Sequence, residues 1–218
     1  MNKSLYPLML SDDVVSAIDR LAYEHGTNRS NMINQILAEY VSYTTPEKRM
    51  EGIFANVEKL LSGRDSFQIL LQNSESVFSL RSPLTYKYNP NVRYTVELYR
   101  AFRGDAFGEL RISLRTQNSS LLLYLTQFYK LWIKLESAYN PNCEYVLDGG
   151  KLTRKLKLDA SLAEKTNEED VGRLIADFIM YFDRAMKAFF YNLNDSSQAV
   201  EQTGRVIREY YRSTPAFI

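Results

Sequence analysis

The sequence predicts an α+β protein in which a small N-terminal module precedes a larger mixed domain. Three observations lead to this class. Residues 3–43 read as one short alternating segment and two amphipathic helices, a unit too small to close a core alone. From residue 66 apolar residues alternate with polar ones, as in strands. After residue 118 they recur mostly at helical spacing, which predicts helices packed on an antiparallel sheet.

The composition of the 218-residue chain is that of a globular protein, with 45% apolar and 13% aromatic residues. No apolar run approaches the length of a membrane span, and the N-terminus lacks the apolar core of a signal peptide. The single Cys143 cannot form an internal disulfide, which fits a reducing compartment. We therefore expect a cytoplasmic protein without a membrane partner.

Charge is unevenly distributed along the chain, although the formal net charge is only +1. Through residue 47, three basic residues face six acidic ones, a net charge of −3. From residue 48 to residue 115, eleven basic residues face seven acidic ones, a net charge of +4. The opening module is therefore acidic, and the segment after it is basic.

The opening module has three predicted elements. Residues 5–10 alternate in the manner of a strand, in which Pro7 must take an outward-pointing amide position. Ser11 then predicts the N-cap of a helix that ends before Gly26. A second helix begins at residues 28–30 and carries a broad apolar stripe.

This order of strand, capping serine, helix, Asn-Arg-Ser turn and second helix resembles the ribbon-helix-helix superfamily of DNA-binding proteins, over about a fifth of the chain. Members pair through their strands into a two-stranded ribbon around an intertwined dimer core, and the ribbon enters the major groove. The resemblance implies a homodimer, or a dimer of dimers, bound to double-stranded DNA. Its core would contain Tyr6, Leu8, Leu10, Ile18, Leu21, Ile33, Ile36 and Leu37.

The resemblance also implies which residues meet DNA. Base edges are read through hydrogen bonds, so the outward strand positions of the family are usually polar or basic. Here they are apolar, and could touch thymine methyl groups or leave recognition to DNA shape. These base-facing positions are Leu5, Pro7 and Met9. Phosphate contacts would come from Lys3, Asn28, Arg29 and Ser30, although helix capping explains the last three equally well.

The rest of the chain divides into a connecting helix and a mixed domain. Proline at a first helical position and an apolar stripe predict a helix within residues 45–64, after a module of residues 1–44. Residues 65–218 then form an α+β domain. Its first strands are predicted at residues 67–71, 77–80, 86–88, 93–102 and 109–115.

The strands predicted at residues 93–102 and 109–115 alternate most clearly. This pair should present one buried face and one solvent-exposed face, here called the wet face. The wet face would carry three arginines around a tyrosine, an arrangement that could bind nucleic acid or a small anionic effector. A solvated face with cross-strand Glu–Arg pairs is the favoured explanation of the same pattern. The residues concerned are Arg93, Tyr99, Arg111 and Arg115.

The C-terminal half predicts helices around one hairpin. A mostly apolar helix follows the capping residues 118–120, and residues 143–158 read as a hairpin with an Asp-Gly-Gly turn. Residues 166–169 form a capping box before a strongly amphipathic helix. A final, more polar helix spans about residues 200–211, and its weaker stripe predicts peripheral packing or a dimer contact.

Motifs that carry chemistry are missing from the sequence. It has no phosphate-loop or Rossmann glycine pattern, no metal-ligand spacing and no nucleophile elbow. The lone His25 is explained as a helix-end residue. We therefore expect no enzyme, no catalytic residues, no cofactor and no metal.

Two functions remain open. The first is a dimeric, DNA-binding transcriptional regulator whose second domain senses an effector or joins dimers. The second is an interaction or assembly protein that keeps the ribbon-helix-helix dimer but has lost sequence-specific DNA binding. The resemblance favours the first, and the apolar outward strand with the net charge of −3 favours the second.

Overall fold

The computed structural model describes residues 5–64, 66–71, 74–158 and 166–214. The chain divides into two compact units, Met1–Arg49 and Met50–Ile218, here called unit 1 and unit 2. Helix α3 (Pro46–Leu61) contains this boundary. It is the connecting helix expected within residues 45–64, and its apolar side chains from Met50 onward belong to the core of unit 2.

Unit 1 contains two helices, α1 (Asp12–Glu24) and α2 (Arg29–Tyr40). Ser11 is the N-cap of α1, as predicted, but its side chain makes no capping hydrogen bond. Gly26 follows with a φ of 61°, a left-handed conformation that glycine adopts without strain. The first helix therefore ends where the sequence predicts.

Residues 5–10 of unit 1 form no strand among the described residues, in contrast to the prediction. The side chains nevertheless differ in exposure between the two sets of alternating positions. Leu5 and Met9 are fully exposed, whereas Leu8 is 60% and Leu10 only 42% exposed. A strand needs a neighbour for its ladder hydrogen bonds, and the neighbour predicted here is a second copy of the chain.

Unit 2 is built on a six-stranded antiparallel sheet with the order β1-β2-β3-β4-β6-β5. This confirms the predicted α+β class. The strands are β1 (Gln68–Ile69), β2 (Val77–Pro83), β3 (Asn91–Arg103), β4 (Ala106–Leu114), β5 (Tyr145–Asp148) and β6 (Lys151–Lys157). The predicted strand at residues 86–88 is wrong, because that segment lies in a turn where Tyr88 and Asn89 have positive φ angles.

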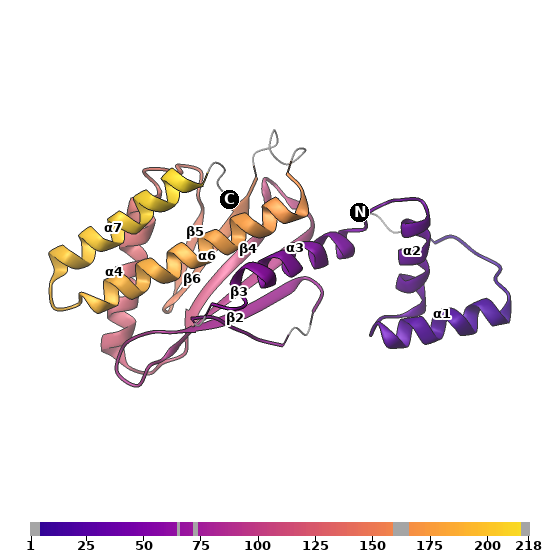
Figure 1. The fold of residues 1–218 in the computed structure, drawn as a ribbon, viewed down its shortest axis with the longest axis horizontal. Coiled ribbons are helices and arrows are strands. Elements are labelled where there is room, and N and C mark those ends of the chain that lie inside the picture. Colours follow the sequence, from indigo (N-terminus) through magenta and orange to yellow (C-terminus); the bar gives the residue numbers. More distant parts are fainter. Residues whose placement is uncertain (1–4, 65, 72–73, 159–165, 215–218) are drawn as a thin grey trace. The chain divides into compact units, whose positions relative to one another are not determined.

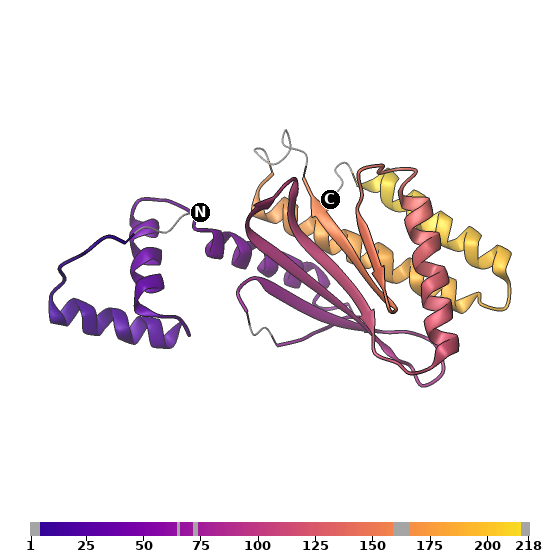
Figure 2. The ribbon, with the colours of Figure 1, turned by 180° about the vertical axis from the view of Figure 1, so that it is seen from behind.

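The alternation of the central strands matches the prediction of one buried and one wet face. In β3 the side chains of Val92, Tyr94 and Val96 are buried, whereas Arg93 between them is exposed. The pairing of β3 with β4 keeps this alternation in register up to Leu98, where the register shifts. Helices α3 and α6 lie across one side of the sheet (Figure 1), and the view from behind shows strands β2 to β4 without a helix over them (Figure 2).

Beyond α3, the described residues of unit 2 form the helices α4 (Ser119–Glu136), α6 (Glu168–Tyr191) and α7 (Ser196–Ser213). Each begins with a side-chain cap, which satisfies one free amide of the first turn. The Asn118 side chain accepts from the amide of Leu121, as the predicted cap requires. For α6 the cap is Asn167 rather than the first residue of the predicted capping box.

The core of unit 2 lies between the sheet and these helices and is rich in aromatic rings. Phe182 of α6 is at its centre, with ring contacts to Tyr94 of the sheet and to Phe128 and Trp132 of α4. Edge-to-face contacts of this kind add to the burial energy of the rings. The long apolar helices predicted from the sequence therefore pack as one core rather than lining a cavity.

Helices α3 and α6 approach each other closely at Gly172. A Cβ added there would lie 2.7 Å from the Asn56 Cβ atom and 2.9 Å from the backbone oxygen of Ile53. These distances are shorter than normal contacts, so the crossing of α3 and α6 depends on the missing side chain.

Candidate nucleic-acid interface

The two helices of unit 1 share a very small core. Its cluster of buried apolar residues comprises Ile18, Ala22 and Met32, with Ile33 packed against them. A folded domain of this size ordinarily buries about 60% of the surface that its unfolded chain exposes. Two helices with so few core side chains have little hydrophobic stabilisation of their own.

Much of the apolar surface of unit 1 is exposed in the single chain. Of the eight residues expected in a dimer core, Ile18 is buried and Ile33 is partly buried. The other six are between 39% and 78% exposed. They are Tyr6, Leu8, Leu10, Leu21, Ile36 and Leu37.

The expected phosphate contact lies at the N-terminus of α2. Asn28 caps the helix, and its side-chain oxygen accepts from the amide of Asn31 at 3.0 Å. Arg29 is bound by a carboxylate of α1: its Nε and Nη2 atoms donate to the two carboxyl oxygens of Asp19 at 2.7 and 2.6 Å. Ser30 is exposed, and Lys3 lies outside the described residues. The capping role of Asn28 is confirmed, while Arg29 forms an ion pair within its own unit.

The hydrogen-bonded pair of Asp19 and Arg29 stabilises the carboxylate form of Asp19 and the protonated form of Arg29. Hydrogen bonding to Arg29 lowers the pKa of Asp19, and the same bonds raise the pKa of Arg29. Both side chains remain about half exposed, so solvent screens their attraction. Arg29 could therefore exchange Asp19 for a phosphate, with the carboxylate as a competitor.

The wet face of the sheet carries a charge network centred on Glu109. Its carboxylate accepts from Tyr99 at 2.8 Å, from Lys155 at 2.7 Å and from Arg111 at 2.8 Å. Arg111 also pairs with Glu97. Burial alone would raise the pKa of Glu109, but the bonds from Lys155, Arg111 and Tyr99 outweigh it and hold the pKa at about 2.

The four residues expected to form an anion site on this face are not equivalent. Arg111 and Tyr99 belong to the Glu109 network, and Arg111 of β4 also pairs with Glu97 of β3, in agreement with the explanation by cross-strand Glu–Arg pairs. Arg93 and Arg115 are exposed, and Arg93 lies opposite Arg81 across the β2–β3 pair. The acidic residue Glu109 lies opposite Glu97 in the alternating pattern, which places both carboxylates on the face where Glu–Arg pairs were expected.

A buried ion pair joins α4 to β6 and is the main feature that the sequence reasoning missed. Arg154 donates from Nη2 to Glu136 at 2.7 Å, and the two side chains are 1% and 0% exposed. The Glu136 carboxylate also accepts from Trp132 at 2.5 Å, from Tyr211 at 2.9 Å and from Tyr145. Hydrogen-bond donors of the protein surround this carboxylate, and water cannot reach it. We therefore interpret the cluster as part of the folded core and not as a ligand-binding site.

A second polar cluster connects the sheet to α6. Tyr94 donates to Asp183 at 2.9 Å, and Lys187 lies 2.7 Å from the other oxygen of that carboxylate. Lys187 also donates to Ser82 at 2.8 Å.

By contrast, the buried hydroxyl of Tyr129 has no hydrogen-bond partner among the described residues. Burial raises the pKa of Tyr129 well above its ordinary value.

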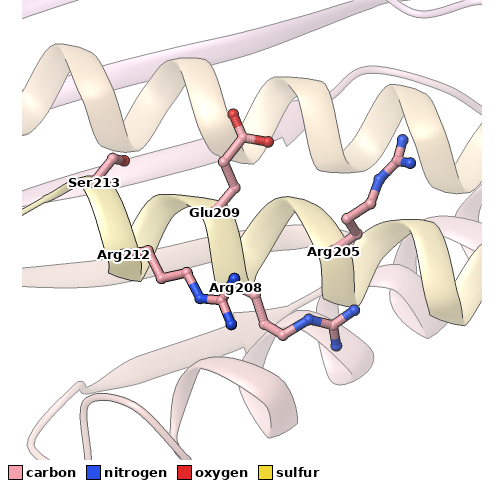
Figure 3. Close-up of a pocket in the computed structure, with 5 residues that line it drawn as sticks. All are labelled: Arg205, Arg208, Glu209, Arg212 and Ser213. Carbon is pink, nitrogen blue, oxygen red and sulfur yellow. The ribbon is translucent and has the colours of Figure 1, made fainter.

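Two open hollows lie along α6 and α7. One has a volume of about 540 Å³, within the range of small-molecule sites, and its lining includes Thr85, Arg184, Lys187 and Gln202. The other has a volume of about 310 Å³ and is shown in Figure 3. It is lined entirely from α7, by Arg205, Arg208, Glu209, Arg212 and Ser213.

The described residues contain no group of three or more histidine, cysteine or acidic side chains that could hold a metal ion. Within the same part of the chain, every helix is too short or too polar to cross a membrane. Comparisons of the chain with protein-family models, with curated proteins and with solved structures found no match.

Proposed function

We propose that the chain is a DNA-binding transcriptional regulator that acts as a homodimer or a dimer of dimers through unit 1. The observation that carries this proposal is the exposed apolar surface of unit 1. Six of the eight side chains that a ribbon-helix-helix dimer would bury are exposed in the single chain, and three of the six belong to residues 5–10, the segment predicted to form the ribbon. A second copy could cover this surface, and the two segments could then pair as a ribbon.

In this dimer the ribbon would present Leu5, Pro7 and Met9 to the bases. These side chains cannot read hydrogen-bonding edges, so recognition would rest on thymine methyl groups and on the deformability of the DNA. Arg29 and the free amides at the start of α2 would contact phosphates. Unit 2 would sense an effector or join dimers, and the hollow that includes Lys187 is a candidate for a small anionic effector.

The competing function is an assembly protein that keeps the dimer and does not read DNA. A specific observation favours it: Arg29, the cation at the expected phosphate contact, is bound by Asp19 of the same chain. Together with the apolar outward positions of residues 5–9, this pairing leaves no unpaired cation among the described residues of the expected phosphate contact, Asn28 to Ser30.

Binding of genomic DNA fragments at several salt concentrations separates the two functions. A regulator retains selected fragments, and its affinity falls as the salt concentration rises. Arg29→Ala should weaken binding and reduce the salt slope by about 0.9, the value for one phosphate contact. Asp19→Asn should strengthen binding, because it removes the carboxylate that competes for the guanidinium.

The opposite effects of these two substitutions form a matched test. If Arg29 only positions α1 against α2, both variants should lower the stability of unit 1, and neither should raise the affinity for DNA. Retention of no fragment at low salt would exclude the regulator and leave the assembly protein.

A further inference from the structure

Three arginines on the solvent side of α7 form what we call the arginine face: Arg205, Arg208 and Arg212. The buried residues of α7, among them Thr203, Ile207 and Tyr210, occupy the opposite side of the helix. All three arginines are exposed, and they line the hollow of about 310 Å³ together with Glu209 and Ser213. This amphipathic division leaves three cations on the solvent-exposed part of α7.

The one acidic residue in this hollow already has a partner. Glu209 pairs with Arg184 of α6, and that hydrogen bond lowers the pKa of Glu209. Figure 3 shows Arg205 and Glu209 extending toward one side of α7, and Arg208 and Arg212 toward the other. Within the part of the chain that the structure describes, Arg208 and Arg212 form no ion pair.

Helix stability does not account for this arrangement. A cation in the last turn complements the helix dipole, which explains Arg212 but not the two earlier arginines. Arg208 and Arg212 are four residues apart, and like charges at that spacing destabilise a helix by a few tenths of a kcal/mol. A binding partner with negative charge would remove this repulsion.

The geometry favours an extended anion over a small one. All lining residues come from one helix, so a small ligand would lack the opposing wall that encloses it in ordinary binding sites. The helical rise separates the backbone positions of Arg205 and Arg212 by about 10 Å, the axial length of about three phosphates along one DNA strand. The planar guanidinium group also matches phosphate oxygens in a bidentate geometry.

We infer that the arginine face of α7 binds the phosphate backbone of double-stranded DNA, an inference that rests on the proposed DNA-binding function. Arg208 and Arg212 make the main contacts, and Arg205 contributes less because Glu209 lies beside it. Unit 2 thereby supplies cations that the acidic unit 1 lacks. The contacts are independent of DNA sequence, because they reach only phosphates.

The test is the salt dependence of duplex DNA binding by the full-length chain. Each phosphate contact contributes about 0.9 to the slope of log affinity against log salt, so Arg208→Gln/Arg212→Gln should reduce the slope by about 1.8. The matched control is Lys151→Gln/Arg173→Gln, which removes the same charge from exposed positions elsewhere in unit 2 and should leave the slope unchanged. Glu209→Gln should raise the affinity, because it removes the acidic side chain from the hollow.

Every outcome bears on the inference, provided that the variants show the same thermal unfolding as the parent. If the parent binds DNA and Arg208→Gln/Arg212→Gln keeps the full slope, the arginine face is not a DNA contact and the proposed function stands. An equal loss of slope in the control would reveal an effect of net charge alone and overturn the inference. If the parent binds no DNA at low salt, the proposed function and the inference both fall.

Discussion

The two units of the chain differ in how completely they bury their apolar residues. Unit 2 has a core cluster of 39 buried apolar residues among those described, whereas the cluster of unit 1 has three. Their charges differ similarly: Glu136 and Arg154 of unit 2 are fully enclosed, and Asp19 and Arg29 of unit 1 are about half exposed. Unit 2 therefore has an extensive apolar core of its own, whereas unit 1 buries few apolar side chains within the single chain.

The largest expected effect comes from breaking the buried ion pair of unit 2. Arg154→Ala leaves the Glu136 carboxylate buried without its cation, which should lower the free energy of unfolding by about 3–5 kcal/mol. The fluorescence of Trp132, the one tryptophan of the chain, reports unfolding of unit 2 alone. The double variant Glu136→Leu/Arg154→Met should be more stable than Arg154→Ala. A loss below about 1 kcal/mol would show that the pair is dispensable.

The next effect concerns acid stability. The pKa of Glu109 is about 2 in the folded chain, below its ordinary value of 4.5, so its contribution to stability is complete above pH 4.5 and lost as the pH falls toward 2. This contribution is on the order of 3 kcal/mol. Denaturation at a series of pH values should show a weaker acid dependence for Glu109→Gln. Asp19→Asn, at an exposed pair of unit 1, is the control and should leave the Trp132 transition unchanged.

If unit 1 is a dimer, the stability of unit 1 should depend on the protein concentration, whereas the stability of unit 2 should not. A tenfold higher protein concentration should stabilise the dimer by about 1.4 kcal/mol, because association favours the folded state. Circular dichroism should then show a concentration-dependent transition that Trp132 fluorescence does not show. Ile36→Ser should abolish this dependence, whereas Tyr23→Ser, at an exposed position outside the expected dimer core, should retain it. Concentration-independent unfolding by both probes would contradict the dimer.

The smallest effect is expected at Tyr129, one of two buried tyrosines of unit 2 that differ in their hydrogen bonds. The hydroxyl of Tyr94 donates to Asp183, so Tyr94→Phe should cost about 1–2 kcal/mol. The hydroxyl of Tyr129 has no partner among the described residues, so Tyr129→Phe should be neutral or slightly stabilising. Urea denaturation of both variants measures the difference. Equal losses would indicate that the Tyr129 hydroxyl has a hydrogen-bond partner.

Local patterns of the sequence predicted much of the fold of unit 2. Alternation identified β3 and β4, and side-chain caps located the starts of helices such as α4. The segment at residues 86–88 misled because its aromatic residues resemble a strand, whereas the positive φ of Asn89 requires a turn. The alternation of apolar and polar residues indicates which face of a strand each side chain occupies. It does not indicate where the backbone turns.

The candidate sites were less predictable because they join residues far apart in the sequence. Glu136 and Arg154 are 18 residues apart, and only the position of Arg154 between the buried Leu152 and Leu156 could have indicated an inward-facing arginine. The arginine face was overlooked because the last helix was interpreted by its weak apolar stripe, and its polar side was not considered. Dimer formation and DNA binding remain predictions, because both concern partners of the chain.

The close crossing at Gly172 has a consequence for mutational tolerance. In most helices alanine is preferred to glycine by about 1 kcal/mol, so a random library would ordinarily be enriched in alanine at such a position. Here the added methyl group would meet Asn56 and the backbone of Ile53, and α3 would have to move away from α6. Selection for folded variants should therefore recover glycine almost exclusively at residue 172, whereas Gly204 of α7, with an arginine side chain as its nearest neighbour, should accept alanine.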